Sequence, residues 1–362
     1  MTTPGRKLDH IRICLEEEVE SAWRPFNDLM LVPRALPGID ASEVNTRCRF
    51  LGKELAAPLM ICGMTGGHPD TKEINRNLAR AAQEVGVALG VGSQRAALED
   101  PMMEETFSVV RDAAPGVPVV GNIGAVQLRK EGPEILDRLA EMIDADALAI
   151  HLNFLQERVQ PEGECWGGGL IEAIGSATRG KVPIIVKETG AGICREDAVA
   201  LVDAGVRIID VGGLGGTSWA AVEARRAEEK GDQESFRLGR TFRNWGLPTP
   251  ASVVECVAAG AEVISSGGVR SGADVAKSLA LGATIAGSAL PLLAPATKSA
   301  EEVAEVLRRY IRELRTSMFL TACVDLAELG SAPIVVGGRV REILDQRGFE
   351  TKKFAIIRDI SR

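Results

Sequence analysis

The sequence predicts an α/β fold of the (β/α)8 TIM-barrel class with an N-terminal extension. The first observation is a repeat in which a helical stretch ends in a small residue and glycine, and a short apolar run follows at once. Glycine just past a helix end supplies a left-handed cap, and a short apolar run is typical of a strand buried on both faces. The second observation is that eight such strands can be counted. A doubly wound open sheet stays the alternative, because strand count alone does not exclude it.

The expected elements alternate along the chain. The strands are 58–62, 87–91, 117–121, 147–150, 182–186, 206–211, 262–266 and 283–286. The helical patterns between them cover 71–85, 101–113, 132–143, 168–178, 195–204, 249–259 and 271–281. Two of these helices begin with a residue that can cap them, Thr249 before a proline and Ser271 before a run of small residues.

Two segments do not fit the repeat. Residues 1–57 are charged and partly helical, and we expect an arm and cover segment that closes the bottom of the barrel or reaches over its mouth. Residues 58–362 then form the barrel and a C-terminal helix. Residues 220–248 are polar without a sustained period, which predicts a long loop between strand 6 and helix 7 that acts as a lid or mobile segment.

Composition excludes several classes of function. The net charge of −8 and the 4% aromatic content, with Tyr310 as the single tyrosine, argue against nucleic acid and anionic membrane as partners. The seven cysteines are odd in number and lack CxxC spacing, which favours a reducing compartment over a disulfide framework. The N-terminus lacks an apolar signal core, and no run approaches the ~20 apolar residues of a membrane span. We therefore expect a cytoplasmic protein.

Glycine and polar residues gather at the carboxyl ends of the expected strands, where barrels of this class carry their active sites. The stretches SSGGVRSGAD at 265–274 and AGSAL at 286–290 follow the last two strands, the usual place of a phosphate site. Lys187 ends the fifth strand. It is either paired with Glu188 or another carboxylate at the rim, or a fixed cation beside the pyrimidine edge of a flavin. The glycine-dense loop after Asp210 lacks the spacing of a dinucleotide fingerprint.

Histidine is informative because there are only three. His151 opens HLNFLQE, which sets four groups able to bind or move protons directly after the fourth strand. His68 is expected to be a surface residue. His10 follows Arg6 and Lys7 in a segment that is either a frayed tail or an arm that brings two cations to an anionic substrate.

Seven stretches together carry a resemblance. They are RKLDH (6–10), MTGG (64–67), GSQR (92–95), HLNFLQE (151–157), VKETGAGI (186–193), DVGGLGGTSW (210–219) and SGGVRSGAD (266–274). In this order, and spread over most of the chain, they resemble the type 2, flavin-dependent isopentenyl-diphosphate isomerases. The related 2-hydroxy-acid oxidases share the phosphate loops but are not expected to carry HLNFLQE or the N-terminal RKxxH.

The resemblance implies an enzyme of isoprenoid biosynthesis that interconverts isopentenyl and dimethylallyl diphosphate. It implies reduced FMN, Mg²⁺, and NADPH as the flavin reductant. The catalytic positions it implies are His10, His151, Asn153, Gln156 and Lys187, and the metal ligand is Glu157. The substrate positions are Arg6, Lys7, Ser93, Gln94, Arg95 and Gln156. The flavin positions are Gly63, Met64, Thr65, Gly66, Ser93, Asn122, Lys187, Gly212, Thr217, Gly268, Val269, Arg270, Ser288 and Ala289.

The chemistry of the reaction agrees with these implications. No common side chain is acidic enough to protonate an alkene easily, so we hypothesise that the reduced flavin moves the proton while His151, Asn153 and Gln156 position the substrate. Two alternatives stay open: a 2-hydroxy-acid oxidase or dehydrogenase, and a non-enzymatic flavin-binding regulator. The resemblance implies a small diphosphate as the partner. The amphipathic stretch 300–325 indicates a homo-oligomer, and we expect a tetramer or octamer.

Overall fold

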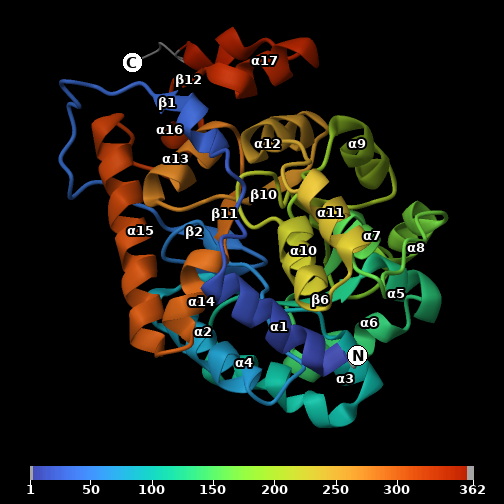
Figure 1. Cartoon of the computed structure of the whole chain (residues 1–362). Helices are drawn as coiled ribbons and strands as arrows, with labels where there is room; N and C mark the ends of the chain where they lie inside the picture. The colour runs from blue at the N-terminus through green and yellow to red at the C-terminus, as the bar shows by residue number, and fades with distance from the viewer. Residues whose placement is uncertain (1–2, 357–362) are drawn as a thin grey trace.

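The computed structural model describes residues 3–356, and a closed barrel of eight parallel strands lies at its centre (Figure 1). The strands follow one another around the barrel in chain order, and the last pairs with the first through Ala286 and Leu59. The predicted barrel is therefore confirmed and the open sheet is excluded. The strands are β4 (Leu59–Ile61), β5 (Ala88–Gly90), β6 (Val119–Gly124), β7 (Ala147–Leu152), β8 (Ile184–Glu188), β9 (Ile208–Asp210), β10 (Glu262–Ser266) and β11 (Ile285–Ser288).

Three central strands, β6, β7 and β8, run further than the sequence predicts. We expected each to end at its first glycine or polar residue, but the backbone ladder continues past that point. The register pairs His151 with Lys187, and Lys187 with Asp210. These polar side chains are thus held at one level by rigid strands, rather than by the loops that follow.

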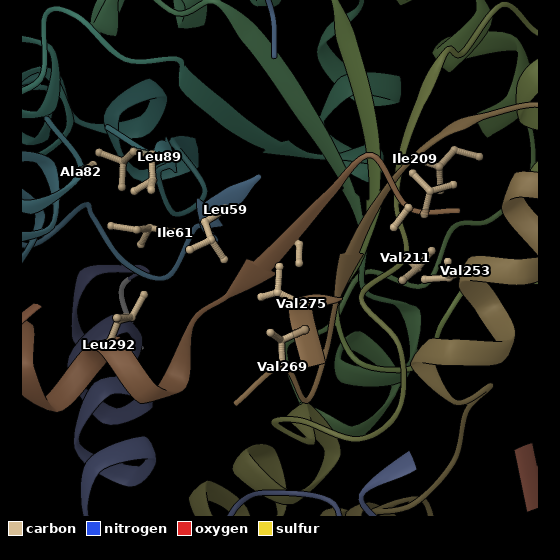
Figure 2. Packing of buried hydrophobic residues seen from close by; sticks show 14 of the residues in the cluster. Leu59, Ile61, Ala82, Leu89, Ile209, Val211, Val253, Val269, Val275 and Leu292 are labelled. Carbon is tan, nitrogen blue, oxygen red and sulfur yellow. The ribbon is translucent and has the colours of Figure 1, made fainter. Parts of the chain in front are cut away.

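Helices cover the outside of the barrel as expected (Figure 1). They are α2 (Thr71–Val85), α4 (Glu105–Ala113), α6 (Ile135–Ile143), α8 (Leu170–Ala177), α9 (Arg195–Asp203), α12 (Thr249–Ala258) and α13 (Gly272–Ala280). Further helices at the strand ends are α3 (Arg95–Glu99), α5 (Ala125–Glu131), α7 (Phe154–Val159) and α14 (Leu290–Ala296). Figure 2 shows how the two layers meet, with Leu59, Ile61 and Leu89 near Ala82 and Leu292, and Ile209 and Val211 near Val253.

One of the two expected caps is wrong. Ser271 caps α13 by accepting a hydrogen bond from the backbone N–H of Asp274 at 3.1 Å. Thr249 lies inside α12, which begins after Pro248. Its hydroxyl lies within hydrogen-bonding distance of three carbonyl oxygens on neighbouring strand ends, the nearest being that of Gly267 at 2.6 Å. This side chain therefore ties two βα loops together instead of capping its helix.

The predicted loop at 220–248 is also wrong, because the segment forms two helices, α10 (Trp219–Glu229) and α11 (Gln233–Thr241). The buried face of α10 consists mainly of alanines together with Glu223 and Arg226, which are 1% and 2% exposed. A face built from small residues and a buried ion pair has little apolar periodicity, so the sequence pattern hid it. Ser218 and Asp232 cap the two helices with their side chains.

Residues before the barrel cover both of its ends. Helix α1 (Thr3–Glu16) crosses the mouth beside α10 and α14 (Figure 1), and Ile13 packs on Ala221 and Val222. At the other end, the hairpin of β2 (Cys48–Phe50) and β3 (Lys53–Leu55) places Phe50 and Leu55 against the side chains inside the barrel. Residues 1–57 were expected either to close the bottom of the barrel or to reach over its mouth, and residues 3–57 do both.

The C-terminal part packs back onto the barrel. The apolar face of α15 (Ala300–Leu320) is buried against α2 and α13, so the amphipathic pattern from which we expected an oligomer is satisfied within one chain. Beyond it, β12 (Ile334–Val336) pairs with β1 (Leu29–Leu31), and α16 (Leu326–Gly330) and α17 (Gly338–Gln346) complete the fold. Among residues 3–356, no helix has the length and apolarity that crossing a membrane requires.

Candidate active site

A cavity opens at the carboxyl ends of the barrel strands, beneath α1 and beside α14. Its walls contain almost every residue that the sequence singled out. From the arm come Arg6, Lys7 and His10, and from the strand ends and loops come Gly63, Met64, Thr65, Ser93, Arg95, Asn122, His151, Asn153, Gln156, Glu157, Lys187, Gly212, Thr217, Gly268, Arg270, Ser288 and Ala289.

Three of the predicted site residues lie outside this wall. Gln94 is fully buried, and its side chain donates to the carbonyl of Leu139 at 3.0 Å and accepts from the N–H of Asn122 at 2.9 Å. Both ends of this amide are used within the protein, so we no longer expect it to contact the substrate. Gly66 packs against the ring of Phe107, and Val269 is in the hydrophobic core.

The hydrogen bonds around His151 select one tautomer. Asn122 donates from its side-chain nitrogen to the carbonyl of Val91 at 3.0 Å, so its amide oxygen faces Nδ1 of His151 at 2.8 Å. Nδ1 therefore carries a proton, and Nε2 remains an acceptor. Burial, followed by the charges of Lys187 and Lys7, lowers the pKa of His151 to about 3. This imidazole is neutral at ordinary pH and can accept a hydrogen bond.

Lys187 does not pair with Glu188, which rejects the first of the two interpretations weighed for it. Its ammonium donates to the backbone carbonyl of Glu188 at 3.1 Å, and it forms no ion pair with any carboxylate in the described part of the chain. The carboxylate of Glu188 instead accepts backbone N–H groups of residues 189–192. Burial raises the pKa of Glu188 to about 7 and also raises that of Asp210. The Lys187 cation stays available to a ligand in the cavity.

Glu223 of α10 connects the arm to the loop after β7. One carboxylate oxygen accepts from His10 Nε2 at 2.8 Å and from Gln156 Nε2 at 3.0 Å. The other accepts from Arg226 at 2.7 Å, and Arg226 also donates to Glu162 at 2.9 Å. Burial would raise the pKa of Glu223, but its partners, chiefly His10, lower it to about 2. A buried carboxylate thus orients two of the predicted catalytic side chains.

Three cations gather at one side of the cavity. Burial, with the charges of Arg6 and Arg95, lowers the pKa of Lys7 to about 8. The side chains of Arg6 and Lys7 have no hydrogen-bond or ion-pair partner among residues 3–356. Cations that repel one another at the wall of a cavity are stabilised when an anion binds between them. Glu157 lies in the same wall and accepts from Asn153 at 2.9 Å and from Gln160 at 2.7 Å.

The opposite side of the cavity is formed by the loops after β10 and β11. A Cβ on Gly268, whose φ is +81°, would lie 2.5 Å from the carbonyl oxygen of Gly215, so only glycine lets the two loops approach this closely. Ser288 donates to the carbonyl of Val269 at 3.1 Å. Arg270 lies in the wall and donates to Glu20 of the segment after α1, at 2.8 Å from its Nε.

Sequence reasoning missed Glu223, Gln127 and Glu164. Glu223 and Arg226 are spaced three residues apart on one helix, which is an ion-pair spacing, but such pairs are usually exposed. Gln127 lines the cavity and donates to Glu164 at 2.9 Å. Gln127 lies in α5, one turn beyond the end of β6, and Glu164 follows α7, so both lie further along the chain than the strand ends where we looked for site residues.

Comparison with known proteins shows what this chain resembles. The family model described as FMN-dependent dehydrogenase matches residues 4–110 and 170–336. A protein of Methanothrix thermoacetophila named isopentenyl-diphosphate delta-isomerase is 63% identical over 355 residues, which covers 98% of this chain and 99% of that protein. Proteins with the same name from Archaeoglobus fulgidus and Halobacterium salinarum are 50% and 49% identical over 96% and 95% of this chain, and over 100% and 97% of their own lengths.

Solved structures add support for the fold. A mandelate oxidase with a bound difluoro hydroxy acid has a TM-score of 0.60 at 20% identity, with 93% of this chain and 92% of that chain covered. A mandelate oxidase variant with benzaldehyde has a TM-score of 0.61 at 20% identity, with coverages of 92% and 95%. These structures share the barrel. The family model passes over residues 111–169, the part of the chain that carries HLNFLQE.

Proposed function

The chain belongs to the isopentenyl-diphosphate delta-isomerases, within the FMN-dependent dehydrogenase family, and from that premise we propose how it works. It interconverts isopentenyl and dimethylallyl diphosphate with reduced FMN and Mg²⁺, and NADPH reduces the flavin. The observation that carries the proposal is the segment 111–169, which the broader family model passes over. Its residues His151, Gln156 and Glu157 line the same cavity as Arg6 and Lys7 of the arm.

The residues of the cavity fit FMN. Thr65 lies in the cavity wall, and its buried hydroxyl has no hydrogen-bond partner among residues 3–356, as expected for a group that a ligand completes. Lys187 supplies a cation that forms no ion pair within the described part of the chain, which suits the pyrimidine edge of a flavin. The glycine loops after β10 and β11, with Ser288 and Arg270, suit its phosphate.

Replacing Thr65 by valine tests this fit. Because the hydroxyl has no partner in the free protein, we expect the apoprotein to lose no stability. FMN affinity should fall by about 2- to 12-fold, the value of one hydrogen bond of about 0.5–1.5 kcal/mol. Urea unfolding and fluorescence titration with FMN measure the two effects.

Thr106→Val is the matched control. The hydroxyl of Thr106 accepts from the N–H of Gly67 at 2.8 Å and donates to the carbonyl of Met103 at 2.6 Å. The free energy of unfolding of this variant should fall by the same amount with and without FMN, so its affinity for FMN should not change. A Thr65→Val protein that binds FMN as tightly as the unchanged protein would remove Thr65 from the flavin site.

The donor set also fits Mg²⁺. The described residues contain no cluster of three or more metal-ligating side chains. Mg²⁺ is commonly held by one or two carboxylates with substrate phosphates and water, so Glu157 beside a bound diphosphate is sufficient. Arg6, Lys7 and Arg95 supply the remaining positive charge to the two phosphates.

The side chains divide the reaction between them. Reduced FMN, when bound, supplies a group that can give and take the proton that the alkene requires. Neutral His151 and the amide groups of Asn153 and Gln156 face the cavity and orient the hydrocarbon part of the substrate. Glu223 keeps Gln156 and His10 in place from behind, and helix α1 with Trp219 covers the mouth against water.

The dependence of substrate affinity on pH should follow Lys7, whose pKa is lowered to about 8. A bound diphosphate favours the charged ammonium. Affinity for the diphosphate is therefore highest when Lys7 is protonated, well below pH 8. As the pH rises through 8 and Lys7 loses its proton, the affinity falls by at most about tenfold per pH unit. Calorimetric titration of the FMN-loaded protein with isopentenyl diphosphate measures this slope. The Lys7→Arg variant, which stays charged, should give a flat profile; an equal decline in that variant would contradict the assignment.

One assay tests the proposed function as a whole. The purified protein with FMN, NADPH and Mg²⁺ should convert isopentenyl diphosphate into dimethylallyl diphosphate, and omission of the reductant should abolish turnover. Reduction of the bound flavin by a 2-hydroxy acid, without isomerisation, would instead support the oxidase alternative. Flavin binding without either activity would support a regulator. The cytoplasmic location and the tetramer or octamer stay predictions, and light scattering of the purified protein decides the second.

A further inference from the structure

The segment between α7 and α8 places a carboxylate at Arg95, one of the cations of the proposed diphosphate subsite. Glu164 accepts from Nη1 of Arg95 at 3.0 Å and from Nε2 of Gln127 at 2.9 Å. Its backbone N–H donates to Glu157 at 2.9 Å. Glu164 thus contacts three groups of the proposed site. They are Arg95, which we propose to bind the phosphates, the side-chain amide of Gln127 in the cavity wall, and Glu157, the proposed metal ligand.

The position of Glu164 is set by its surroundings. The side chains of Arg95 and Glu164 are 29% and 22% exposed, so their ion pair is partly shielded from water. A Cβ on Gly163 would lie 1.7 Å from the carbonyl oxygen of Glu157, which shows how closely this segment packs on α7. Gln160 holds the same carboxylate oxygen of Glu157 that Glu164 contacts.

Arg95 is paired with two carboxylates before a ligand binds. Glu164 accepts from its Nη1 at 3.0 Å and Glu99 accepts from its Nε at 2.7 Å. A diphosphate without a metal brings further negative charge beside Glu164, and its oxygens compete with that carboxylate for Arg95. A diphosphate with Mg²⁺ brings two compensating positive charges.

We infer that Glu164 makes the diphosphate subsite selective for the metal-complexed form of its ligand. Its carboxylate competes with metal-free diphosphate for Arg95 and Gln127, and that competition is relieved when Mg²⁺ accompanies the ligand. This inference rests on the proposed function, because it requires the diphosphate to bind beside Arg95. It assigns Glu164 a role in selectivity that is separate from metal ligation by Glu157.

Binding of inorganic pyrophosphate to the FMN-loaded full chain tests the inference. Calorimetric titrations in excess EDTA and in saturating Mg²⁺ are compared for the unchanged protein and Glu164→Gln. With EDTA, the variant should bind pyrophosphate about tenfold more tightly, since a repelling charge beside Arg95 is gone. With Mg²⁺, the two proteins should differ by less than about threefold, so the ratio of the two dissociation constants falls in the variant.

Glu99→Gln is the matched control. It removes the other carboxylate that accepts from Arg95, at the exposed C-terminal end of α3. Its pyrophosphate affinity in EDTA should change by less than about threefold, because an exposed charge is screened.

Each outcome is decisive. Unchanged or weaker binding of metal-free pyrophosphate by Glu164→Gln would overturn the role of Glu164. An equal gain in EDTA and in Mg²⁺ would do so as well, because it would show general charge repulsion and no selectivity. Failure of the unchanged protein to bind pyrophosphate under either condition would instead overturn the proposed diphosphate subsite and, with it, the proposed function.

Discussion

Replacing Glu223 by glutamine is expected to lower kcat about 100-fold, because it releases two side chains that the reaction needs in place. The carboxylate of Glu223 holds Nε2 of Gln156 at 3.0 Å and Nε2 of His10 at 2.8 Å. A glutamine amide offers one acceptor oxygen and, in place of the second, a donor that Arg226 repels. FMN binding should be unchanged, and steady-state kinetics with isopentenyl diphosphate measures the loss.

The same substitution should reduce stability, since it leaves buried Arg226 with one charged partner fewer. The loss should be about 2 kcal/mol near neutral pH. The pKa of Glu223 is lowered to about 2, so the stability that its charge contributes is present above the ordinary value of 4.5 and disappears as the pH falls toward 2. Urea unfolding at several pH values should therefore show the gap between variant and unchanged protein closing in acid.

Glu229→Gln provides the matched control for Glu223. Glu229 lies on the same helix and also binds the arm, through Arg12 at 2.6 Å, but both side chains are more than 40% exposed. Exposed pairs contribute about 0–1 kcal/mol, so kcat and stability should hardly change. If Glu223→Gln kept kcat within about threefold of the unchanged enzyme, the positioning role of Glu223 would be wrong.

Replacing Glu157 by glutamine is expected to cost about 100- to 1,000-fold in kcat/KM at fixed Mg²⁺, the scale of several kcal/mol that a positioned metal contributes. Glutamine keeps the size of the side chain but has one acceptor oxygen, so it can accept from Asn153 or from the N–H of Glu164, which contact different oxygens of the carboxylate, but not from both. It loses the negative charge that Mg²⁺ requires. Activity titrated with Mg²⁺ should saturate in the unchanged enzyme and stay low and nearly flat in the variant.

Two further measurements make the Glu157 result interpretable. Far-ultraviolet circular dichroism and FMN binding should be unchanged, which separates metal loss from misfolding. Glu172→Gln, a neutralised carboxylate on the exposed surface of α8, should leave the Mg²⁺ dependence intact. Unchanged Mg²⁺ dependence in Glu157→Gln would show that Glu157 is an ordinary polar residue of α7 and not a metal ligand.

The barrel and much of its cavity wall could be predicted from the sequence because both depend on local signals. Gly86, Gly205 and Gly260 mark helix ends, and the short apolar runs after them predict strands buried on both faces. In a closed parallel barrel all carboxyl ends meet at one side. His151 and Lys187, which lie at the carboxyl ends of two neighbouring strands, therefore had to face a common cavity.

The helical pair α10 and α11 could not be predicted in the same way. The hydrogen bonds of Glu223 join residues separated by 67 and 213 positions, and no local pattern records such contacts. A charged residue on a helix is normally exposed. The sequence pattern around Glu223 and Arg226 therefore indicated a solvent-exposed segment, although this face of α10 is buried. Gln94 was wrongly predicted to contact the substrate. It follows a strand, but its side chain is buried in the protein interior and points away from the cavity.

The sequence by itself determined the class of fold, the residues that stand at the strand ends and the chemical groups brought to the cavity. These follow from hydrophobic periodicity, glycine positions and the direction of parallel strands, which are properties of short segments. Only the tertiary structure decided that Nδ1 of His151 carries the proton and that Lys187 has no ion-pair partner among residues 3–356. It also decided that Glu164 pairs with Arg95 and that Glu223 holds Gln156. Hydrogen bonds and charge balance depend on distances between segments that are remote in sequence, and these distances exist only once the barrel has closed.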